Sequence, residues 1–212
     1  MIPEDVYLAY LDHLIIGART PCAIIVQELL SKAVDVRAIY IDLFQRSMYE
    51  VGSLWERNKI SVATEHLATA ITESLLALVY PGIFAAEHIG RSAVIACVAN
   101  EYHQIGAKMV ADVFELNGWN GYFVGANTPI GDLLKLIGEK TPEIVGLSLS
   151  VSSNMPNLRE TIEAVRASYP NMKLLLGGYA FQSAGTSICQ QYPNVRYVGL
   201  LKDLEHLIAE GG

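Results

Sequence analysis

The spacing of the apolar residues changes near residue 90, and this change constrains the fold more than any other feature of the chain. From Ile2 to about Tyr80, apolar residues recur at helical spacing. After Gly90, short apolar runs alternate with amphipathic stretches of helical length. Two periods in one chain predict two domains, a helical bundle over residues 1–82 and an α/β domain over residues 90–212.

Capping residues divide the first part of the chain into helices. Four are predicted, over residues 3–16, from 20 onward, over 35–51 and over 61–80. Pro21 stands at the first position of the second helix, where a missing N–H costs nothing. The Pro81-Gly82 pair is predicted to end the fourth helix. Four helices joined by short loops are typical of a small four-helix bundle.

The second part contains five apolar runs, each followed by a helical stretch. Strands are predicted at 92–99, 121–125, 143–149, 172–177 and 195–200, with helices at 105–117, 129–138, 155–168, 179–191 and 201–209. Successive β-α units predict a flavodoxin-like (Rossmann-like) five-stranded parallel sheet with helices on both faces. Ligands bind such sheets beyond the carboxyl ends of the strands, where the strand order reverses. For the flavodoxin-like order, that point lies between the first and third strands.

A carboxylate and an imidazole follow the first predicted strand. Glu101 stands two residues before His103, a spacing that can orient the imidazole and raise its basicity as a metal ligand. Gly106 would let the next helix start close to a bulky ligand. Taken alone, the pattern also fits a His103 that only caps a helix.

Two more strand ends at the same edge of the sheet carry small or polar residues. The third strand is followed by a polar lip that runs from Ser148 to Asn154. The fourth is followed by Gly177-Gly178, where no side chain blocks an approach to the backbone. These segments and the His103 loop are expected to surround one ligand.

Together these motifs resemble the B12-binding domain, whose pattern is D-x-H-x-x-G, then S-x-L, then G-G. Here 41 residues separate Gly106 from Ser148, and 26 separate Ser150 from Gly177, which are the spacings of that family. The resemblance implies a cobalamin whose cobalt is held by His103 in place of the cofactor's own dimethylbenzimidazole base. It also implies a nucleotide tail that lies beside Ser148 and enters the core past the two glycines.

The chain departs from the family pattern at two positions. Glu101 replaces the usual Asp, which keeps the charge on an arm one methylene longer, and Ser150 replaces the usual Leu, which loosens one wall of the tail pocket. The resemblance implies the following cofactor-binding residues in this domain: Glu101, Tyr102, His103, Gln104, Ile105, Gly106, Ser148, Ser150, Val151, Gly177 and Gly178.

A narrower motif lies in the helical part. Trp55 is followed by nine residues and then by Glu65-His66. Taken singly, each is more often a structural or surface residue. The W-x9-E-H spacing resembles the light-sensing cobalamin regulators. By that resemblance the bundle is a cap, Trp55 covers the upper face of the corrin, and Glu65 and His66 face the upper ligand, with His66 a possible upper cobalt ligand.

These resemblances leave two functions open. The first is a sensor module: adenosylcobalamin binds, light breaks its cobalt–carbon bond, and the cap then moves and changes a contact with a partner protein or a second copy. The alternative is a corrinoid methyl carrier that holds methylcobalamin as a subunit of a methyltransferase system. A third, plainer possibility is a protein that only holds B12. No catalytic activity of the chain's own is expected.

Composition bears on partners and location. With a formal net charge of −7, the chain has no basic footprint, so no direct contact with nucleic acid is expected. The light-sensing regulators carry an N-terminal winged helix-turn-helix, whereas this sequence starts at the predicted cap, so a module without a DNA-binding domain is expected. Neither a signal peptide nor a segment able to span a bilayer is expected. Its three cysteines lack metal-ligand spacing, which is typical of free thiols in a reducing cytosol, so a cytoplasmic protein without membrane contact is predicted.

Overall fold

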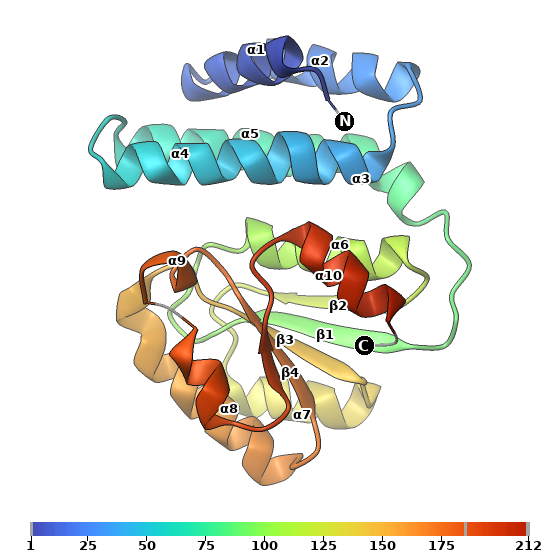
Figure 1. The fold of residues 1–212 in the computed structure, drawn as a ribbon, viewed down its shortest axis with the longest axis vertical. Coiled ribbons are helices and arrows are strands. Elements are labelled where there is room, and N and C mark those ends of the chain that lie inside the picture. The colour runs from blue at the N-terminus through green and yellow to red at the C-terminus, as the bar shows by residue number, and fades with distance from the viewer. Residues whose placement is uncertain (1, 185, 211–212) are drawn as a thin grey trace. The chain divides into compact units, whose positions relative to one another are not determined.

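The computed structural model describes residues 2–184 and 186–210. They form two compact units, with the division between Ala85 and Ala86. Figure 1 shows the helical unit in blue to green and the α/β unit in green to red.

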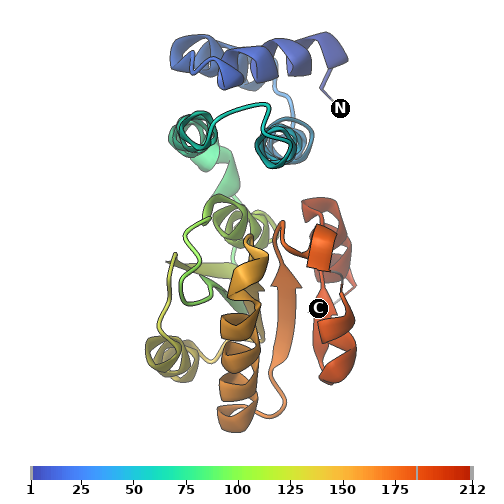
Figure 2. The same ribbon diagram turned by 90° about the vertical axis from the view of Figure 1, so that its left-hand side faces the viewer.

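The helices of the first unit lie close to their predicted positions. They are α1 (Glu4–Ile15), α2 (Arg19–Ser31), α3 (Val36–Ala38), η1 (Ile39–Gln45), α4 (Arg46–Glu56) and α5 (Val62–Ile83). α1 and α2 lie side by side, as do α4 and α5, which Figure 2 shows nearly end-on. The helical half of the predicted fold class is therefore confirmed.

The third predicted helix is longer than expected and changes its winding. It continues without a break from Val36 to Glu56, and its segment η1 is a π-helix. Four apolar side chains of that segment are buried in the core of the unit: Ile39, Tyr40, Leu43 and Phe44. They form two pairs of adjacent residues, and the wider π turn lets both members of each pair face the core. The predicted end at Val51 is wrong because the helix continues through Gly52 and Ser53.

The predicted end of the fourth helix at Pro81-Gly82 is also wrong, because α5 runs to Ile83. A Cβ at Gly82 would lie 2.7 Å from a methyl group of Val36, so glycine lets the last turn pack closely there. Counted in full, α5 is long and apolar enough to cross a membrane by length and composition. The expectation that no segment would meet this test is corrected. One face of α5 is nevertheless buried within the helical unit.

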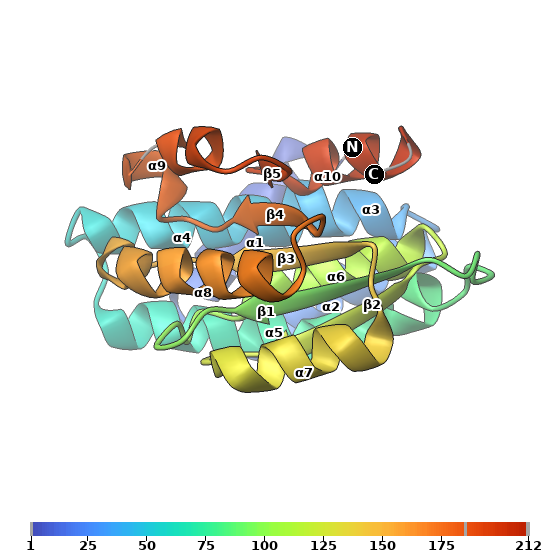
Figure 3. The same ribbon diagram turned by 90° about the horizontal axis from the view of Figure 1, so that it is seen from below.

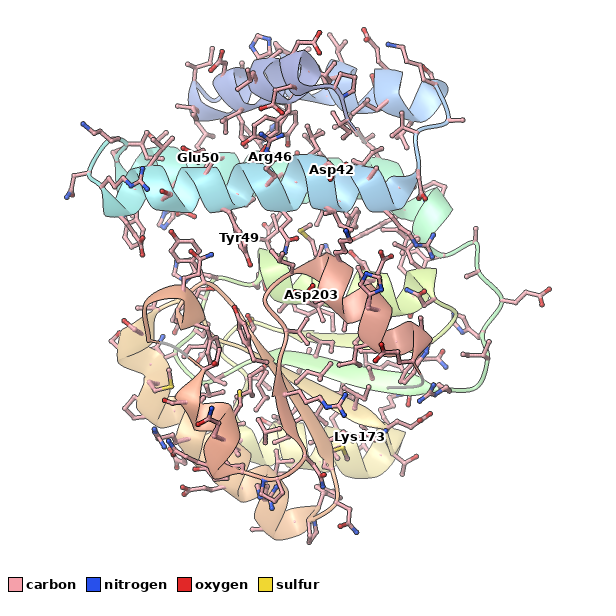
Figure 4. All side chains as sticks on the ribbon, in the orientation of Figure 1. Asp42, Arg46, Tyr49, Glu50, Lys173 and Asp203 are labelled. Carbon is pink, nitrogen blue, oxygen red and sulfur yellow. The ribbon has the colours of Figure 1, made fainter. Side chains whose placement is uncertain are left out.

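An arginine joins the two helix pairs of this unit. Arg46 points from α4 toward α1, as Figure 4 shows. Its guanidinium group donates to both carboxylate oxygens of Glu4, at 2.7 and 2.6 Å, and lies 3.5 Å from the ring centroid of Tyr7. A forked ion pair combined with ring stacking suits arginine and would not be reproduced by lysine.

The second unit contains the predicted parallel sheet. Its strands are β1 (Ser92–Cys97), β2 (Asn120–Gly125), β3 (Ile144–Ser148), β4 (Lys173–Gly177) and β5 (Val195–Tyr197). All neighbours pair in parallel in the order β2-β1-β3-β4-β5. The predicted switch point between the first and third strands is therefore present. Cys97 is paired with Ser148, and Ser148 with Gly177, so the three strand ends meet at one edge.

Helices cover both faces of this sheet. They are α6 (Ile105–Leu116), α7 (Ile130–Lys140), α8 (Met155–Ser168) and α10 (Leu201–Ala209). α6 packs beside α10 on one face, and α7 packs beside α8 on the other, which is the face turned to the viewer in Figure 3. Apolar side chains of β1, β3 and β4 form a core with α7 and α8.

The single helix predicted over residues 179–191 is wrong. The described residues form two short helices, α9 (Phe181–Ala184) and η3 (Ser187–Gln191), while residue 185 lies outside the described part of the chain. A further short helix, η2 (Ser152–Asn154), precedes α8. These short elements follow the carboxyl ends of β4 and β3, where the candidate site is built.

Candidate functional site

The loop between β1 and α6 carries the predicted cobalt ligand. The chain turns at Asn100, whose φ of 63° lies in the left-handed region that asparagine tolerates. After this turn Glu101 is fully buried, whereas Tyr102 is 66% exposed. The loop therefore directs an acidic side chain into the protein two residues before His103.

The buried carboxylate of Glu101 accepts four hydrogen bonds. Its Oε1 accepts from the backbone N–H of His103 at 3.0 Å and lies 2.6 Å from the Nδ1 of the same residue. Its Oε2 accepts from the backbone N–H groups of Ser150 and Val151, at 2.8 and 3.0 Å. One side chain thus joins the loop after β1 to the lip after β3.

These contacts keep Glu101 ionised. Burial alone would raise the pKa of its carboxyl group. The hydrogen bonds from the His103 side chain and from backbone N–H groups outweigh burial and lower that pKa to about 2. Because the carboxylate can only accept, Nδ1 of His103 carries the proton.

A protonated Nδ1 leaves the lone pair of the imidazole on Nε2, the nitrogen that a metal would meet. The side chain of His103 is 41% exposed, so its ring can be reached from outside. A Cβ built on Gly106 meets nothing within 4 Å, which leaves open space beside the first turn of α6. Of the other predicted contacts in this loop, Gln104 is half-buried and Ile105 is buried.

Three asparagines hold the backbone of this loop. The sequence pattern marks Asn154 only as the last residue of the polar lip and does not point to Asn127 or Asn157. Asn127 lies in the loop after β2, Asn154 ends η2, and Asn157 is in the first turn of α8. Their amides bind the backbone of Ala99 and Asn100 at 2.8 to 3.0 Å. All three follow the carboxyl ends of parallel strands, and this position was the signal that could have singled them out.

The predicted tail segments lie where expected, but the two glycines are tightly packed. Ser148 is buried at the end of β3, opposite Gly177. A Cβ on Gly178 would lie 2.2 Å from the carbonyl oxygen of Leu149, and one on Gly177 would lie 3.0 Å from that of Val198. Close backbone packing therefore already requires glycine at Gly178. A slot for a nucleotide tail stays a prediction.

The motif residues of the helical unit lie at one end of it. Trp55 is near the end of α4, and Glu65 and His66 are in the first turns of α5, which follows after a short turn. Trp55 is 40% exposed, and the side chain of His66 is 69% exposed. The Glu65 carboxylate accepts from Thr69 at 2.9 Å and lies 3.6 Å from His66. These are the partners of Glu65, rather than the indole of Trp55.

Comparison with known proteins shows the family of the chain. A family model described as a B12 binding domain matches residues 91–202, and a second model with the same description matches residues 8–80. The chain belongs to the B12-binding domain family. The His103 loop, the Ser148 strand end and the Gly177-Gly178 pair of this cobalamin-binding protein all lie inside the first match.

Two kinds of relative are similar to this B12-binding chain. The HTH-type transcriptional repressor CarH of Myxococcus xanthus is 27% identical over 67% of this chain and 47% of its own length. Dimethylamine corrinoid protein 1 of Methanosarcina acetivorans is 28% identical over 62% of this chain and 63% of its own length. The chain thus spans about half to two thirds of these relatives.

A solved structure shares the fold. The monomethylamine corrinoid protein of Methanosarcina barkeri matches with a TM-score of 0.85 over 98% of both chains, at 12% identity. This likeness confirms the predicted fold class, a helical part followed by a five-stranded parallel sheet.

The donor set fits a cobalamin. A corrin ring supplies the equatorial nitrogens of its cobalt, so the protein needs to provide one imidazole from one side. In this loop, His103 supplies one half-exposed imidazole whose Nδ1 is held by an ionised carboxylate, and open space lies beside Gly106. This is the arrangement expected of a metal-ligating histidine with an orienting partner.

Proposed function

We propose that this protein binds cobalamin in the base-off/His-on form, with His103 as the lower cobalt ligand. The observation that carries the proposal is the 2.6 Å contact between Nδ1 of His103 and the buried carboxylate of Glu101. A carboxylate on one ring nitrogen fixes the tautomer and raises the basicity of the other. A histidine that only capped α6 would not need a fully buried acid at its side.

The remaining residues of the α/β unit would position the cofactor. Ser148, Ser150 and Val151 lie on the β3 side of the switch point, where the nucleotide tail is expected. Tyr102, Gln104 and the first turn of α6 flank His103. Cobalamin would supply a cobalt–carbon bond that light or a methyl acceptor can break.

As the finer function we propose an adenosylcobalamin-dependent light sensor. Two observations support it: the Trp55 and Glu65-His66 motif at one end of the helical unit, and the similarity to CarH over 67% of the chain. His66 is exposed and could approach the upper position of the cobalt. The output would pass through a protein partner or a second copy of the chain.

A methyl carrier is the second candidate. The similarity to dimethylamine corrinoid protein 1 and the fold shared with the monomethylamine corrinoid protein favour it. In that function the protein would hold methylcobalamin and present it to methyltransferase partners. The chain would then be the corrinoid subunit of an enzyme without catalytic residues of its own.

Illumination separates the two candidates. The protein is loaded with adenosylcobalamin in the dark, and its absorption spectrum and hydrodynamic size are measured before and after light. A sensor shows a changed size and a new spectrum of cobalt with two imidazole ligands, and the His66→Ala variant loses that spectrum. His13→Ala, which changes a histidine of α1, is the matched control.

The opposite result has an equally clear form. The protein is a carrier if it fails to retain adenosylcobalamin, binds methylcobalamin tightly and passes the methyl group of that cofactor to a partner. In that case the sensor proposal is wrong, while His103 can still be the cobalt ligand.

A further inference from the structure

The loop that carries His103 is held from outside by asparagine side chains. Asn127 accepts from the backbone N–H of Asn100 through its Oδ1 at 2.8 Å. Asn154 and Asn157 donate through their Nδ2 atoms to the carbonyl oxygens of Asn100 and Ala99, each at 3.0 Å. The backbone directly before Glu101 is therefore held by hydrogen bonds from three asparagine side chains.

Asn127 contacts this loop a second time through its own backbone. Its N–H donates to the carbonyl oxygen of Glu101 at 2.8 Å. The φ of Asn127 is 48°, and that of Asn100 is 63°, so both residues are in the left-handed region. Asparagine is among the few residues that adopt this conformation readily. These two asparagines are hydrogen-bonded to each other and join the loops after β1 and β2.

The asparagine hydrogen bonds fix the backbone, and the side chain of Glu101 then orients His103. The side chain orients the imidazole of His103, but it can do so only if the backbone of Glu101 is itself fixed. Its carboxylate is also bound to the N–H groups of Ser150 and Val151 after β3. Contacts from the loops after β2 and β3 therefore determine where the imidazole lies.

We propose that Asn127, Asn154 and Asn157 are positioning residues for the cobalt ligand, acting through the backbone of residues 99–101. This inference rests on the proposed role of His103. None of the three needs to touch the cofactor. Each lies on a loop or helix that begins at the carboxyl edge of the sheet, so the ligand is coupled to the starts of α7 and α8.

The chemistry of each hydrogen bond provides a matched pair of variants. Asn127 acts with its side chain as an acceptor, so Asn127→Asp keeps the acceptor and the tolerance for a left-handed φ. Asn157 acts as a donor, so Asn157→Asp loses the hydrogen bond and places a carboxylate against a carbonyl oxygen. Asn157 lies in the first turn of α8, where an acidic residue is favourable for the helix.

The test measures two quantities for each variant. One is the ratio of His-on to base-off cobalamin in the absorption spectrum at saturation, and the other is the unfolding temperature of the cofactor-free protein. Loss of one such hydrogen bond is expected to lower the ratio about fivefold in Asn157→Asp and in Asn154→Ala. Asn127→Asp should keep the parent ratio, whereas Asn127→Ala should lower it. The unfolding temperature of Asn157→Asp should stay close to that of the parent, because the favourable charge at the start of α8 offsets most of the lost hydrogen bond.

The outcomes separate this inference from the proposed function. If the parent protein and His103→Ala give the same spectrum, the ligand assignment and the positioning inference both fail. If the parent shows the His-on spectrum and Asn157→Asp and Asn154→Ala keep it, only the positioning inference fails. If the ratio falls only in proportion to the unfolding temperature, the asparagines are merely structural and the inference is again wrong.

Discussion

The carboxylate Oε1 of Glu101 lies 2.6 Å from Nδ1 of His103, and the Oε2 of the same carboxylate receives two backbone N–H groups from the segment after β3. One buried acid therefore both orients the candidate cobalt ligand and ties its loop to the neighbouring strand end. The longer arm of glutamate explains how a single side chain reaches both partners, at a position where the family usually has aspartate.

Shortening this arm should loosen the ligand. In Glu101→Asp, the carboxylate is one methylene shorter and should no longer reach His103 and the N–H groups of Ser150 and Val151 at the same time. We expect the ratio of His-on to base-off cobalamin to fall about tenfold, which corresponds to a loss of about 1.4 kcal/mol. Absorption spectroscopy at saturating cobalamin measures this ratio. An unchanged ratio in Glu101→Asp would show that the arm length is irrelevant.

The ionised state of Glu101 should make the stability of the cofactor-free protein depend on pH. Its pKa is about 2 in the folded protein, against an ordinary value of 4.5. Because the folded pKa is the lower one, the contribution is complete above pH 4.5 and is lost as the pH falls toward 2. At full size it is up to about 3 kcal/mol. Urea unfolding at several pH values measures it.

The isosteric variant Glu101→Gln provides the reference for that series. It cannot ionise, so the difference in unfolding free energy between parent and variant isolates this carboxyl group from the other acids. The difference should shrink between pH 4.5 and 2. A difference that stays constant over this window would contradict the lowered pKa.

Gly178 should tolerate no side chain, even without the cofactor. Its φ is 116°, and a Cβ would meet the backbone of Leu149 at 2.2 Å. Gly178→Ala should destabilise the cofactor-free protein by about 2 kcal/mol or more. Gly106→Ala is the matched control, because its Cβ meets nothing within 4 Å and alanine favours the helix. Equal unfolding midpoints for the two variants would refute this reading.

That packing also limits how the tail slot can be tested. If Gly178 only kept the approach to the backbone free, as the sequence suggests, Gly178→Val would block the nucleotide tail and leave the fold intact. The geometry shows that the substitution also disturbs the packing of β4 against Leu149, so a loss of cobalamin binding in this variant would not locate the slot. Variants of Ser148 are the cleaner probe.

The candidate site was predictable from the sequence where its residues are close together in the chain or follow directly from the ends of predicted strands. Glu101 and His103 are two residues apart, and the strand ends that carry Ser148 and Gly177 follow from runs of apolar residues. The contacts of Asn127 and Asn157 were not predictable, because they join residues 27 and 58 positions apart through loop conformations that periodicity does not encode.

The same distinction explains the errors in the fold. Pro81 was interpreted as a helix end, but packing of the last turn around Gly82 against Val36 carries α5 to Ile83. The π-helical segment η1 arises where several bulky side chains enter one core, and apolar spacing alone does not distinguish it from an α-helix. Tertiary packing decided both features.

The most direct test of the central claim is an electron paramagnetic resonance spectrum of the cobalt(II) form of the bound cofactor. The protein is labelled with ¹⁵N only at histidine, and His66→Ala is used to remove the other candidate imidazole. If His103 ligates the cobalt, each cobalt line is split into a doublet by one ¹⁵N nucleus, and the doublet disappears in the additional variant His103→Ala. A triplet from ¹⁴N, the signature of the cofactor's own benzimidazole base, would contradict the account.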